Sequence, residues 1–585
     1  MKKLSHQLIG SLCLLLLVMA QIGCEKAEDF LDKKSTNSLD ETTVFADSAH
    51  TMDFLGGVYH GLFIWRVSGP SNGVENILVA VTDEAEQRYP AAGMLETQIL
   101  TGSFGGTFNS YINDSWSFLY THIRLANIYL KHVDGSPLSA SLKKRTKQET
   151  RFLRAYFYAR LMEGWGGVPL MGDTVFDLNS SAGGGRNTYA ECVDYVISEL
   201  DAVAPDLPLT YSGLNYGRVT KGAALALKAR VLLFAASPLY NGGSVADKPE
   251  LKELTAYPTH DPSRWQKALE ACQAVVDLGI YELETDNETK PGNGFYEMFL
   301  ERVNKEYILA YMMGPNVYLE QFNMPPSRGY WNSYHRCPTQ ELVDAFPMLN
   351  GKAIDDPTSG YDPANPYEGR DPRFYYSIIY NGSLYFNRNG RAMKPVWTYE
   401  GASPDGIVPV SSGGATHTGY YYRKMSDEQI PYRGGGNTNR CLPIMRYGSL
   451  LLDLAEAANE TGNIPLALDQ LIEIRKRAGI EPGGDSMYGL PANPSQDETR
   501  ELIRRERFIE LAFEGYRFFD IRRWKAGDII DEKYTHGMRI LKDGNDFTYE
   551  RIEVRKHVFK ENLYLFPIPF DEVSINRDLL QNPGW

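Results

Sequence analysis

Residues 446–479 constrain the fold more strongly than any other part of the chain. Their sequence, RYGSLLLDLAEAANETGNIPLALDQLIEIRKRAG, contains two apolar runs at helical spacing, joined by a short Thr-Gly-Asn turn. The side chains expected to face one another are small or aliphatic: Leu451, Leu454, Ala455 and Ala458 on the first helix, and Leu468, Leu471 and Ile472 on the second. A helical hairpin of about 34 residues with small side chains at the crossing is typical of a tetratricopeptide unit. The pattern therefore predicts a scaffold of stacked helical pairs.

Similar helical patterns recur, less regularly, in the N-terminal half. Residues 151–167 predict a helix that ends at a glycine cluster, and residues 264–279 predict an amphipathic helix with a glycine stop. Residues 220–243 predict a helix that ends before Pro238, because the residue before a proline disfavours helical geometry. This last helix has a small-residue face that would let a second helix approach closely, made by Gly222, Ala226 and Ala229.

A segment of roughly residues 281–440 lacks helical periodicity. It is dense in Gly, Pro, Tyr and Asn, and only short runs such as RFYYSIIY (373–380) have the pattern of a strand. Loops of this length in a compact protein are usually functional or disordered, and the many aromatic rings argue against disorder. We therefore expect a mainly α protein, in which a helical-hairpin scaffold carries a large, irregular, loop-rich ligand-binding part with a few short strands.

The N-terminal residues predict the compartment. Lys2 and Lys3 precede the apolar run LCLLLLVMA, which is too short to span a bilayer and is typical of a signal peptide. The run stops at Gly23-Cys24 and acidic residues follow, a pattern similar to bacterial lipoprotein sites in which the new N-terminal cysteine carries a diacylglycerol. We expect Cys24 to be lipidated, so that the chain is anchored to a membrane rather than spanning it. The alternative is an ordinary secretory peptide with an incidental cysteine.

The expected organisation is therefore a signal peptide followed by one globular unit. The signal peptide covers residues 1–23 and the unit residues 24–585. Its parts are an N-terminal part with helical hairpins, the loop-rich insertion and a C-terminal helical part, at residues 24–280, 281–440 and 441–585 respectively.

The charge of the chain excludes some classes of partner. The formal charge is −14, and it becomes −16 when Lys2 and Lys3 leave with residues 1–23, which contain no acidic residue. An anionic surface is unsuited to nucleic acids or to a basic groove for polyanions. Aromatic residues make up 12% of the chain, with 37 tyrosines. Tyrosine provides stiff contact area with a polar tip, which suits a binding surface.

No metal or cofactor site is indicated by residue spacing. Four cysteines beyond the N-terminal segment are scattered, without a C-x-x-C pair: Cys192, Cys272, Cys337 and Cys441. Zinc is therefore not indicated, whereas one or two disulfides are compatible with export. Three aspartates could bind calcium, but their spacing fits no known calcium loop and favours a solvated loop: Asp355, Asp356 and Asp362. No phosphate-binding pattern follows the GGG segments at 183–185 and 434–436, and no H-E-x-x-H motif occurs.

One acidic stripe has two interpretations. Glu506, Glu510 and Glu514 recur at every fourth position in RRERFIELAFEGYRFFDIRRW, the spacing of a catalytic stripe on a helix. Arginines in the same stretch, among them Arg507, favour a helix laced by ion pairs. We therefore interpret the three glutamates as structural.

Two aromatic loops are the candidate ligand site. A pyranose has one face of C–H groups and a rim of hydroxyls, so its site needs flat aromatic rings with hydrogen-bonding side chains beside them. The segment PPSRGYWNSYH (325–335) supplies both through Arg328, Tyr330, Trp331, Asn332, Tyr334 and His335. The segment LFIWRVSGPSNGVEN (62–76) supplies a second set through Trp65, Arg66, Asn72 and Asn76. Weaker candidates are Trp397 and Tyr420 to Tyr422, because THTGYYYRK has the pattern of a strand packed on the scaffold.

Several motifs together resemble the SusD/RagB family of surface lipoproteins. They include RFLRAYFYARLMEGWGGVPL, TKGAALALKARVLLFAASPLYN, CPTQELVDAFPMLNGKAI, the 446–479 hairpin and LFPIPFDEVSINRDLLQNPGW, and the matches run in family order from about residue 24 to 585. The resemblance implies about four tetratricopeptide-like pairs and a loop-rich part that bears the ligand site. It also implies attachment to the outer membrane, facing the cell exterior. The implied partner is a SusC-like TonB-dependent outer-membrane transporter, over which the lipoprotein sits as a lid that captures glycans or peptides.

The expected function is therefore non-catalytic binding of an oligosaccharide or polysaccharide. Capture of peptides is an alternative on the same fold, although tryptophan beside amide side chains favours sugar. A glycoside hydrolase is a further alternative, because a pair of catalytic carboxylates has no fixed spacing in sequence. Nothing beyond the abundance of Asp and Glu supports that enzyme.

Overall fold

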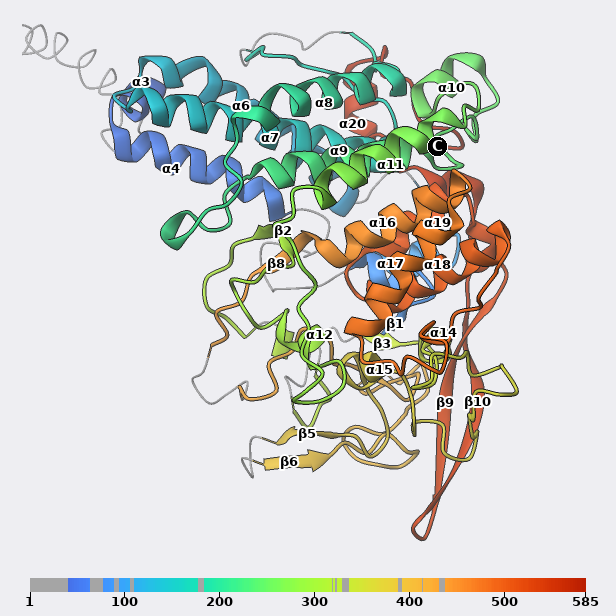
Figure 1. Ribbon diagram of the computed structural model, residues 1–585. Coiled ribbons are helices and arrows are strands. Elements are labelled where there is room, and N and C mark those ends of the chain that lie inside the picture. The colour runs from blue at the N-terminus through green and yellow to red at the C-terminus, as the bar shows by residue number, and fades with distance from the viewer. Residues whose placement is uncertain are drawn as a thin grey trace, which may run out of the picture.

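The computed structural model (Figure 1) describes residues 40–63, 77–88, 94–105, 110–176, 184–317, 319–320, 324–328, 336–387, 392–412, 414–430 and 437–585. In the view of Figure 1, helices of the N-terminal half form an upper layer, and helices between residues 447 and 523 form a second layer below it. The segment that lies between them in sequence forms a third, irregular layer at the bottom. The insertion is thus carried on one side of the helical scaffold.

The scaffold consists of helices packed in pairs. Eight of the longer described helices form four pairs: α4 (Ser48–Tyr59) with α6 (Ser110–His132), α7 (Ala140–Trp165) with α8 (Tyr189–Val203), α9 (Lys221–Ala236) with α11 (Ser263–Val276), and α16 (Tyr447–Glu460) with α17 (Ile464–Arg477). Successive pairs also touch, α6 against α7, α8 against α9 and α11 against α16, so the stack continues across the insertion. The predicted scaffold of tetratricopeptide-like pairs is confirmed. Helix α18 (Gln496–Glu510) packs on the last pair and is followed by α19 (Tyr516–Arg523).

Shorter helices complete the described part. They are α3 (Glu41–Phe45), α5 (Leu95–Leu100), α10 (Pro249–Thr255), α12 (Asn293–Glu297), α14 (Gln340–Ala345), α15 (Pro372–Ser377) and α20 (Phe570–Ile575), with short 3-10 turns such as η1 (His60–Phe63) and η2 (Ile77–Val81). Within the described ranges, none of the helices combines the length and the apolar character needed to cross a membrane.

Local sequence explains where the scaffold helices begin and end. Helix α9 begins after Thr220, whose side chain accepts the backbone N–H of Ala223 (3.1 Å), and it ends one residue before Ser237-Pro238. The small face of α9 accepts a close neighbour, but at Gly222 this neighbour is not the predicted helix: a Cβ there would lie 2.0 Å from Oη of Tyr281, in the irregular segment after α11. Substitution at Gly222 would therefore push the two segments apart.

Strands occur as five antiparallel two-stranded sheets among the described residues. The pairs are β1 (Ala85–Gln87) with β3 (Arg336–Pro338), β2 (Tyr307–Tyr311) with β8 (Leu442–Arg446), β4 (Ile378–Ile379) with β7 (Tyr421–Tyr422), β5 (Leu384–Asn387) with β6 (Ala392–Pro395), and β9 (Tyr534–Asp543) with β10 (Asp546–Lys556). The β9–β10 hairpin projects beside the irregular layer (Figure 1). Its turn, Asp-Gly-Asn-Asp at 543–546, has the composition typical of a tight hairpin turn.

The strand predicted at 373–380 is largely wrong. Residues Pro372–Ser377 form α15, and only Ile378–Ile379 form a strand. Asp371 accepts the backbone N–H of Arg373 (2.8 Å) and so caps the helix, while Pro372 at the first helical position favours helical geometry. The capping residues outweigh the β propensity of the aromatic and isoleucine side chains.

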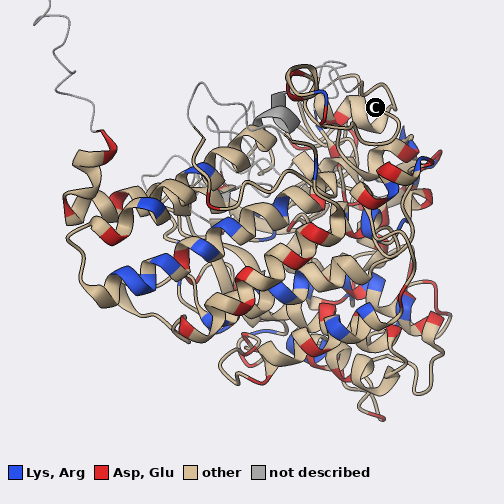
Figure 2. Cartoon of the chain, turned by 90° about the horizontal axis from the view of Figure 1, so that it is seen from above, with Lys and Arg blue, Asp and Glu red and all other residues tan. Residues whose placement is uncertain are grey.

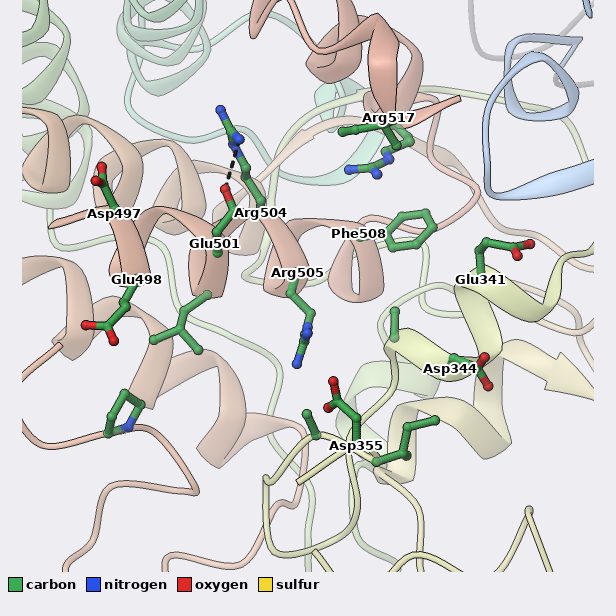
Figure 3. A pocket seen from close by; sticks show the side chains of 16 residues that line it. Glu341, Asp344, Asp355, Asp497, Glu498, Glu501, Arg504, Arg505, Phe508 and Arg517 are labelled. Carbon is green, nitrogen blue, oxygen red and sulfur yellow. Dashed lines mark hydrogen bonds and ion pairs between the residues drawn. The ribbon is translucent and has the colours of Figure 1, made fainter. Parts of the chain in front are cut away.

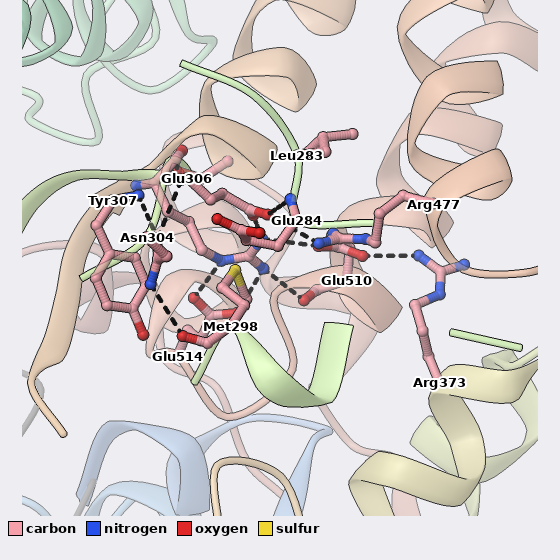
Figure 4. Close-up of polar contacts among 12 residues, drawn as sticks. Leu283, Glu284, Met298, Asn304, Glu306, Tyr307, Arg373, Arg477, Glu510 and Glu514 are labelled. Carbon is pink, nitrogen blue, oxygen red and sulfur yellow. Dashed lines mark hydrogen bonds and ion pairs between the residues drawn. The ribbon is translucent and has the colours of Figure 1, made fainter. Parts of the chain in front are cut away.

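A buried ion network joins the insertion to the scaffold, and Figure 4 shows the part of it around Glu510. Five cations and five carboxylates take part, and each is at most 3% exposed: Arg373, Lys424, Arg446, Arg475 and Arg477 with Glu306, Asp371, Glu506, Glu510 and Glu514. The charges therefore balance within the network. Because buried charges must be paired, this set fixes the contact between the insertion and the C-terminal helices.

The network confirms the structural interpretation of the acidic stripe but corrects its partners. Glu510 is bound by Arg373 (2.9 Å), Arg446 (2.8 Å) and Arg477, all from other segments. Burial alone would raise the pKa of Glu510, but these guanidinium groups hold that pKa well below its usual range. Arg507, expected beside the stripe, instead pairs with Asp453 and Asp520 at 2.6 and 3.0 Å.

The upper surface carries charges of both signs. Figure 2 shows Lys and Arg interspersed with Asp and Glu along the helices of this face. Pairs such as Lys144 with Asp206 (2.8 Å) and Arg151 with Glu199 (2.8 Å) join neighbouring segments of the scaffold. An exposed pair such as that of Lys144 and Asp206 contributes at most about 1 kcal/mol, so the scaffold depends mainly on apolar burial.

Candidate functional site

Most of the predicted site residues lie outside the described part of the chain. This holds for Trp65, Arg66, Asn72 and Asn76 in the first loop, for Tyr330, Trp331, Asn332, Tyr334 and His335 in the second, and for Cys24. Their roles therefore stay predictions. The structure does describe Arg328 and the segments from which both loops leave the fold.

Both loops leave from the junction between helical scaffold and insertion. The first follows η1, where Nδ1 of His60 lies 3.2 Å from Oη of Tyr311 at the end of β2. The second leads into β3, in which Arg336 pairs with Gln87 of β1. A buried ion pair between Arg336 and Glu96 (3.0 Å) ties β3 to α5. The stem of the second loop is thus held by a buried contact, whereas the His60–Tyr311 contact at the first is exposed.

Arg328 holds its segment against the β5–β6 hairpin. Its Nη2 donates to the carbonyl oxygens of Lys394 (3.1 Å) and Pro395 (3.0 Å), and its Nη1 donates to Oγ of Ser327 (2.7 Å). The backbone N–H of Ser327 donates to Asp405 (2.8 Å). Burial lowers the pKa of Arg328, and the nearby Asp405 carboxylate partly offsets this effect. In this structure Arg328 positions the start of the aromatic loop, while the predicted contact with ligand stays a prediction.

The weaker aromatic candidates divide into two groups. Tyr420, Tyr421 and Tyr422 are buried, and the last two form β7 against β4, which confirms the interpretation of this stretch as a packed strand. Trp397, in contrast, is 39% exposed and stacks on Phe547 of β10, with ring centroids 5.7 Å apart and planes 23° apart. Of these candidates, Trp397 alone presents its ring to solvent.

A charged cleft of about 900 Å³ lies on the outer side of α18 (Figure 3). Its walls come from α14, α18 and the loop at 353–355, with Leu502 and Phe508 among the apolar lining. Arg505 points across the cleft toward Asp355 (Figure 3). Sequence analysis did not predict this cleft, because its walls are far apart in the chain.

Most of the carboxylates around this cleft already have structural partners. Glu501 pairs with Arg504 (2.9 Å), Glu341 pairs with Arg551 (2.9 Å), and Glu498 closes the capping box of α18. Such carboxylates stabilise the walls of the cleft. We therefore assign the cleft no chemistry.

The predicted calcium candidates form turns. Asp356 accepts the backbone N–H of Thr358 (2.7 Å), and Asp362 accepts that of Ala364 (2.9 Å). Within the described ranges, no group of His, Cys, Asp and Glu side chains is arranged to hold a metal ion. The four cysteines left open by the sequence are buried free thiols: Cys192, Cys272, Cys337 and Cys441.

Two family models and several known proteins match this chain. A family model described as the SusD family matches residues 283–585, and one described as "Starch-binding associating with outer membrane" matches residues 29–233. SusD-like protein P2 of Formosa agariphila is 24% identical over 486 residues, which are 82% of each chain.

Solved structures show the same similarity. A SusD-like protein from Bacteroides fragilis is 26% identical, with a TM-score of 0.73 over 94% of this chain and 99% of its own. A SusD-like carbohydrate binding protein from the same species is 24% identical, with a TM-score of 0.69 over 92% of this chain and 100% of its own. With more than half of its length matched by the family model and the paired-helix scaffold in place, the chain belongs to the SusD family.

Proposed function

We propose that the protein is a lipid-anchored, outer-membrane binding protein that captures an oligosaccharide or polysaccharide without cleaving it. It then delivers the glycan to a SusC-like TonB-dependent transporter at the cell exterior. Membership of the SusD family is the observation that carries this proposal. The signal-peptide pattern that ends at Cys24 supports the anchor, and the name of the carbohydrate-binding structural relative supports the ligand class.

The chemistry of the two aromatic loops supports glycan as the ligand. Trp65 and Trp331 provide flat rings for the C–H face of a pyranose, and neighbouring amide and guanidinium groups suit its hydroxyl rim. A site of this kind needs a rigid support, because ordering a flexible ligand and a flexible loop together weakens binding. The buried contact at the stem of the second loop is consistent with that requirement.

The test is affinity electrophoresis in gels that contain soluble starch, laminarin, arabinoxylan or polygalacturonic acid. We expect at least one polysaccharide to retard the wild-type protein, and Trp65→Ala and Trp331→Ala each to reduce the retardation with little change in thermal midpoint. Tyr534→Ala, an exposed aromatic of β9 outside both loops, is the matched control. If Trp331→Ala lowers the midpoint by many degrees and leaves binding intact, that ring is part of the core and the loop assignment is wrong.

Two further measurements address the remaining parts of the proposal. Release of reducing ends from the retarding polysaccharide by purified protein would show an enzyme instead of a carrier. A peptide mixture serves as the competing ligand, and displacement of the glycan by peptide would favour the alternative ligand class. Replacing Cys24 by Ala should move the protein from the membrane fraction to the soluble fraction of the producing cells.

A further inference from the structure

The β5–β6 hairpin exposes an apolar face. In its register, Leu384 lies opposite Pro395 and Phe386 lies opposite Met393, and directly opposed residues of an antiparallel pair point to the same side. Leu384 is 52% exposed and Met393 is 46% exposed. Large apolar side chains gathered on one exposed face are uncommon and often mark an interaction site.

The same face continues along the chain to Trp397. Pro395 and Trp397 alternate with Val396 and Thr398, which are fully buried, so the first two point outward, and all four residues of β6 are exposed. Gly382 donates its backbone N–H to the carbonyl oxygen of Val396 (2.7 Å), which extends the pairing beyond β6.

The indole of Trp397 is held over the neighbouring strand. A Cβ at Gly382 would lie 3.4 Å from Cζ3 of Trp397, an ordinary contact distance, so the indole lies directly against this residue. On the β9–β10 hairpin, Phe547 stacks on the indole, and Nζ of its cross-strand partner Lys542 lies 5.9 Å from the ring centroid. Figure 1 shows both hairpins in the part of the molecule away from the upper helices. The ring is thus fixed between two hairpins while more than a third of it stays exposed.

We propose that this face is a second glycan-contact surface that extends the site formed by the aromatic loops; the inference rests on the proposed function. Arg328 provides the continuity, because it joins the start of the 325–335 segment to the backbone of β6 at Lys394 and Pro395. A fixed aromatic ring beside the ammonium group of Lys542 suits both the C–H face and the hydroxyl rim of a sugar. A second copy of the chain or another protein is the competing occupant.

The length of the face predicts which ligands use it. Four residue steps from Met393 to Trp397 span about 13 Å in an extended strand, which is longer than one sugar ring. The surface therefore adds contacts only for a chain that already fills the loops and continues beyond them. Long oligosaccharides should gain affinity from it, and short ones should not.

The experiment compares oligosaccharides of three and seven units, prepared from whichever of the four gel polysaccharides retards the wild-type protein. We expect Trp397→Ala to weaken binding of the seven-unit chain about five- to tenfold by isothermal titration calorimetry and to leave the three-unit chain unchanged. Because Trp397 packs on Phe547, a second variant keeps the indole and carries Leu384→Ser and Met393→Ser. We expect it to weaken only the longer chain, by about twofold or more. Tyr534→Ala and Leu209→Ser, exposed apolar residues elsewhere, are the matched controls.

The outcomes separate this inference from the proposed function. Unchanged affinity of the seven-unit chain in both hairpin variants, while Trp331→Ala loses binding, overturns the second surface and leaves the proposed function intact. Failure of the wild-type protein to bind any of the four polysaccharides overturns both. If the wild-type protein dimerises in sedimentation velocity and the double variant is a monomer with unchanged sugar affinity, the face is a self-association surface and the inference is wrong.

Discussion

Replacing Glu510 by Gln should destabilise the fold far more than a single hydrogen bond would suggest. Its two carboxylate oxygens bind three guanidinium groups, those of Arg373, Arg446 and Arg477. The side-chain amide of glutamine keeps one oxygen as an acceptor, but an NH2 group takes the place of the second oxygen and faces an arginine guanidinium group. It also leaves the balanced set of five cations and five carboxylates with one uncompensated positive charge.

The expected cost follows from the burial of every partner. Removing one member of a buried ion pair typically costs 3–5 kcal/mol, because the remaining charge stays without water, so we expect about 4 kcal/mol for Glu510→Gln. The matched control is Glu501→Gln on the same helix, where the carboxylate is 70% exposed and pairs with Arg504 (2.9 Å). There we expect at most about 0.5 kcal/mol.

The assay is urea unfolding followed by circular dichroism and by tryptophan fluorescence. A double variant, Glu510→Gln with Arg477→Met, restores neutrality and should cost at least about 1 kcal/mol less than the sum of the two single variants. A loss below about 1 kcal/mol for Glu510→Gln, or strict additivity in the double variant, would refute the idea that charge balance within the network stabilises the fold.

Three other predictions concern the interior. Burial raises the pKa of the Glu84 carboxyl from 4.5 to about 8. The unfolded chain therefore releases this proton at a lower pH than the folded chain does. Between these two pKa values, the free energy of unfolding falls as the pH rises. Glu84→Gln should remove this loss, giving a variant about 4 kcal/mol more stable than wild type near pH 8 and nearly equal to it near pH 4.5. Equal pH profiles of the two proteins in urea unfolding would contradict this. Gly222→Ala should lower the free energy of unfolding by about 1–3 kcal/mol, because the new methyl group meets Tyr281. The control is Gly57→Ala on α4, where the space around the glycine is open, so no clash should destabilise that variant. The four buried thiols should react with Ellman's reagent only after unfolding, because the reagent cannot reach them and because burial raises the pKa of both Cys192 and Cys441 to about 12. Rapid reaction of the folded protein would show that these sites are open.

The helical scaffold could be predicted from the sequence because its signals are local. Periodic apolar residues, a proline after Ser237 and the Thr-Gly-Asn turn before α17 each act within a few residues, and the hairpin at 446–479 appears as α16 and α17. The strand prediction at 373–380 was wrong because Asp371 and Pro372, just outside or at the edge of the run, favour a helix start. Capping residues therefore need the same weight as periodicity in short segments.

The sequence could predict the residue types of the candidate site but not the contacts that hold it. Aromatic and amide side chains concentrated in two loops indicate a sugar-binding composition, but the pairing of β1 with β3 at the stem of the second loop joins residues about 250 positions apart. The role of Arg328 as a clamp on β6 also depends on a contact over 66 and 67 positions. The partners of the Glu506 stripe were likewise missed, since they come from four other segments of the chain.

The buried ion network also sets an order of events during synthesis. Residues 281–440, including Arg373 and Lys424, leave the ribosome before Glu506, Glu510 and Glu514 exist, and three of the five network carboxylates are these late ones. An unpaired cation does not enter a dry interior, so the insertion cannot dock in its final place until α18 and Glu514, which precedes α19, have been synthesised. For an exported chain, the loop-rich part should therefore be the last region to become protease resistant, although most of its residues are made before the helices that receive it.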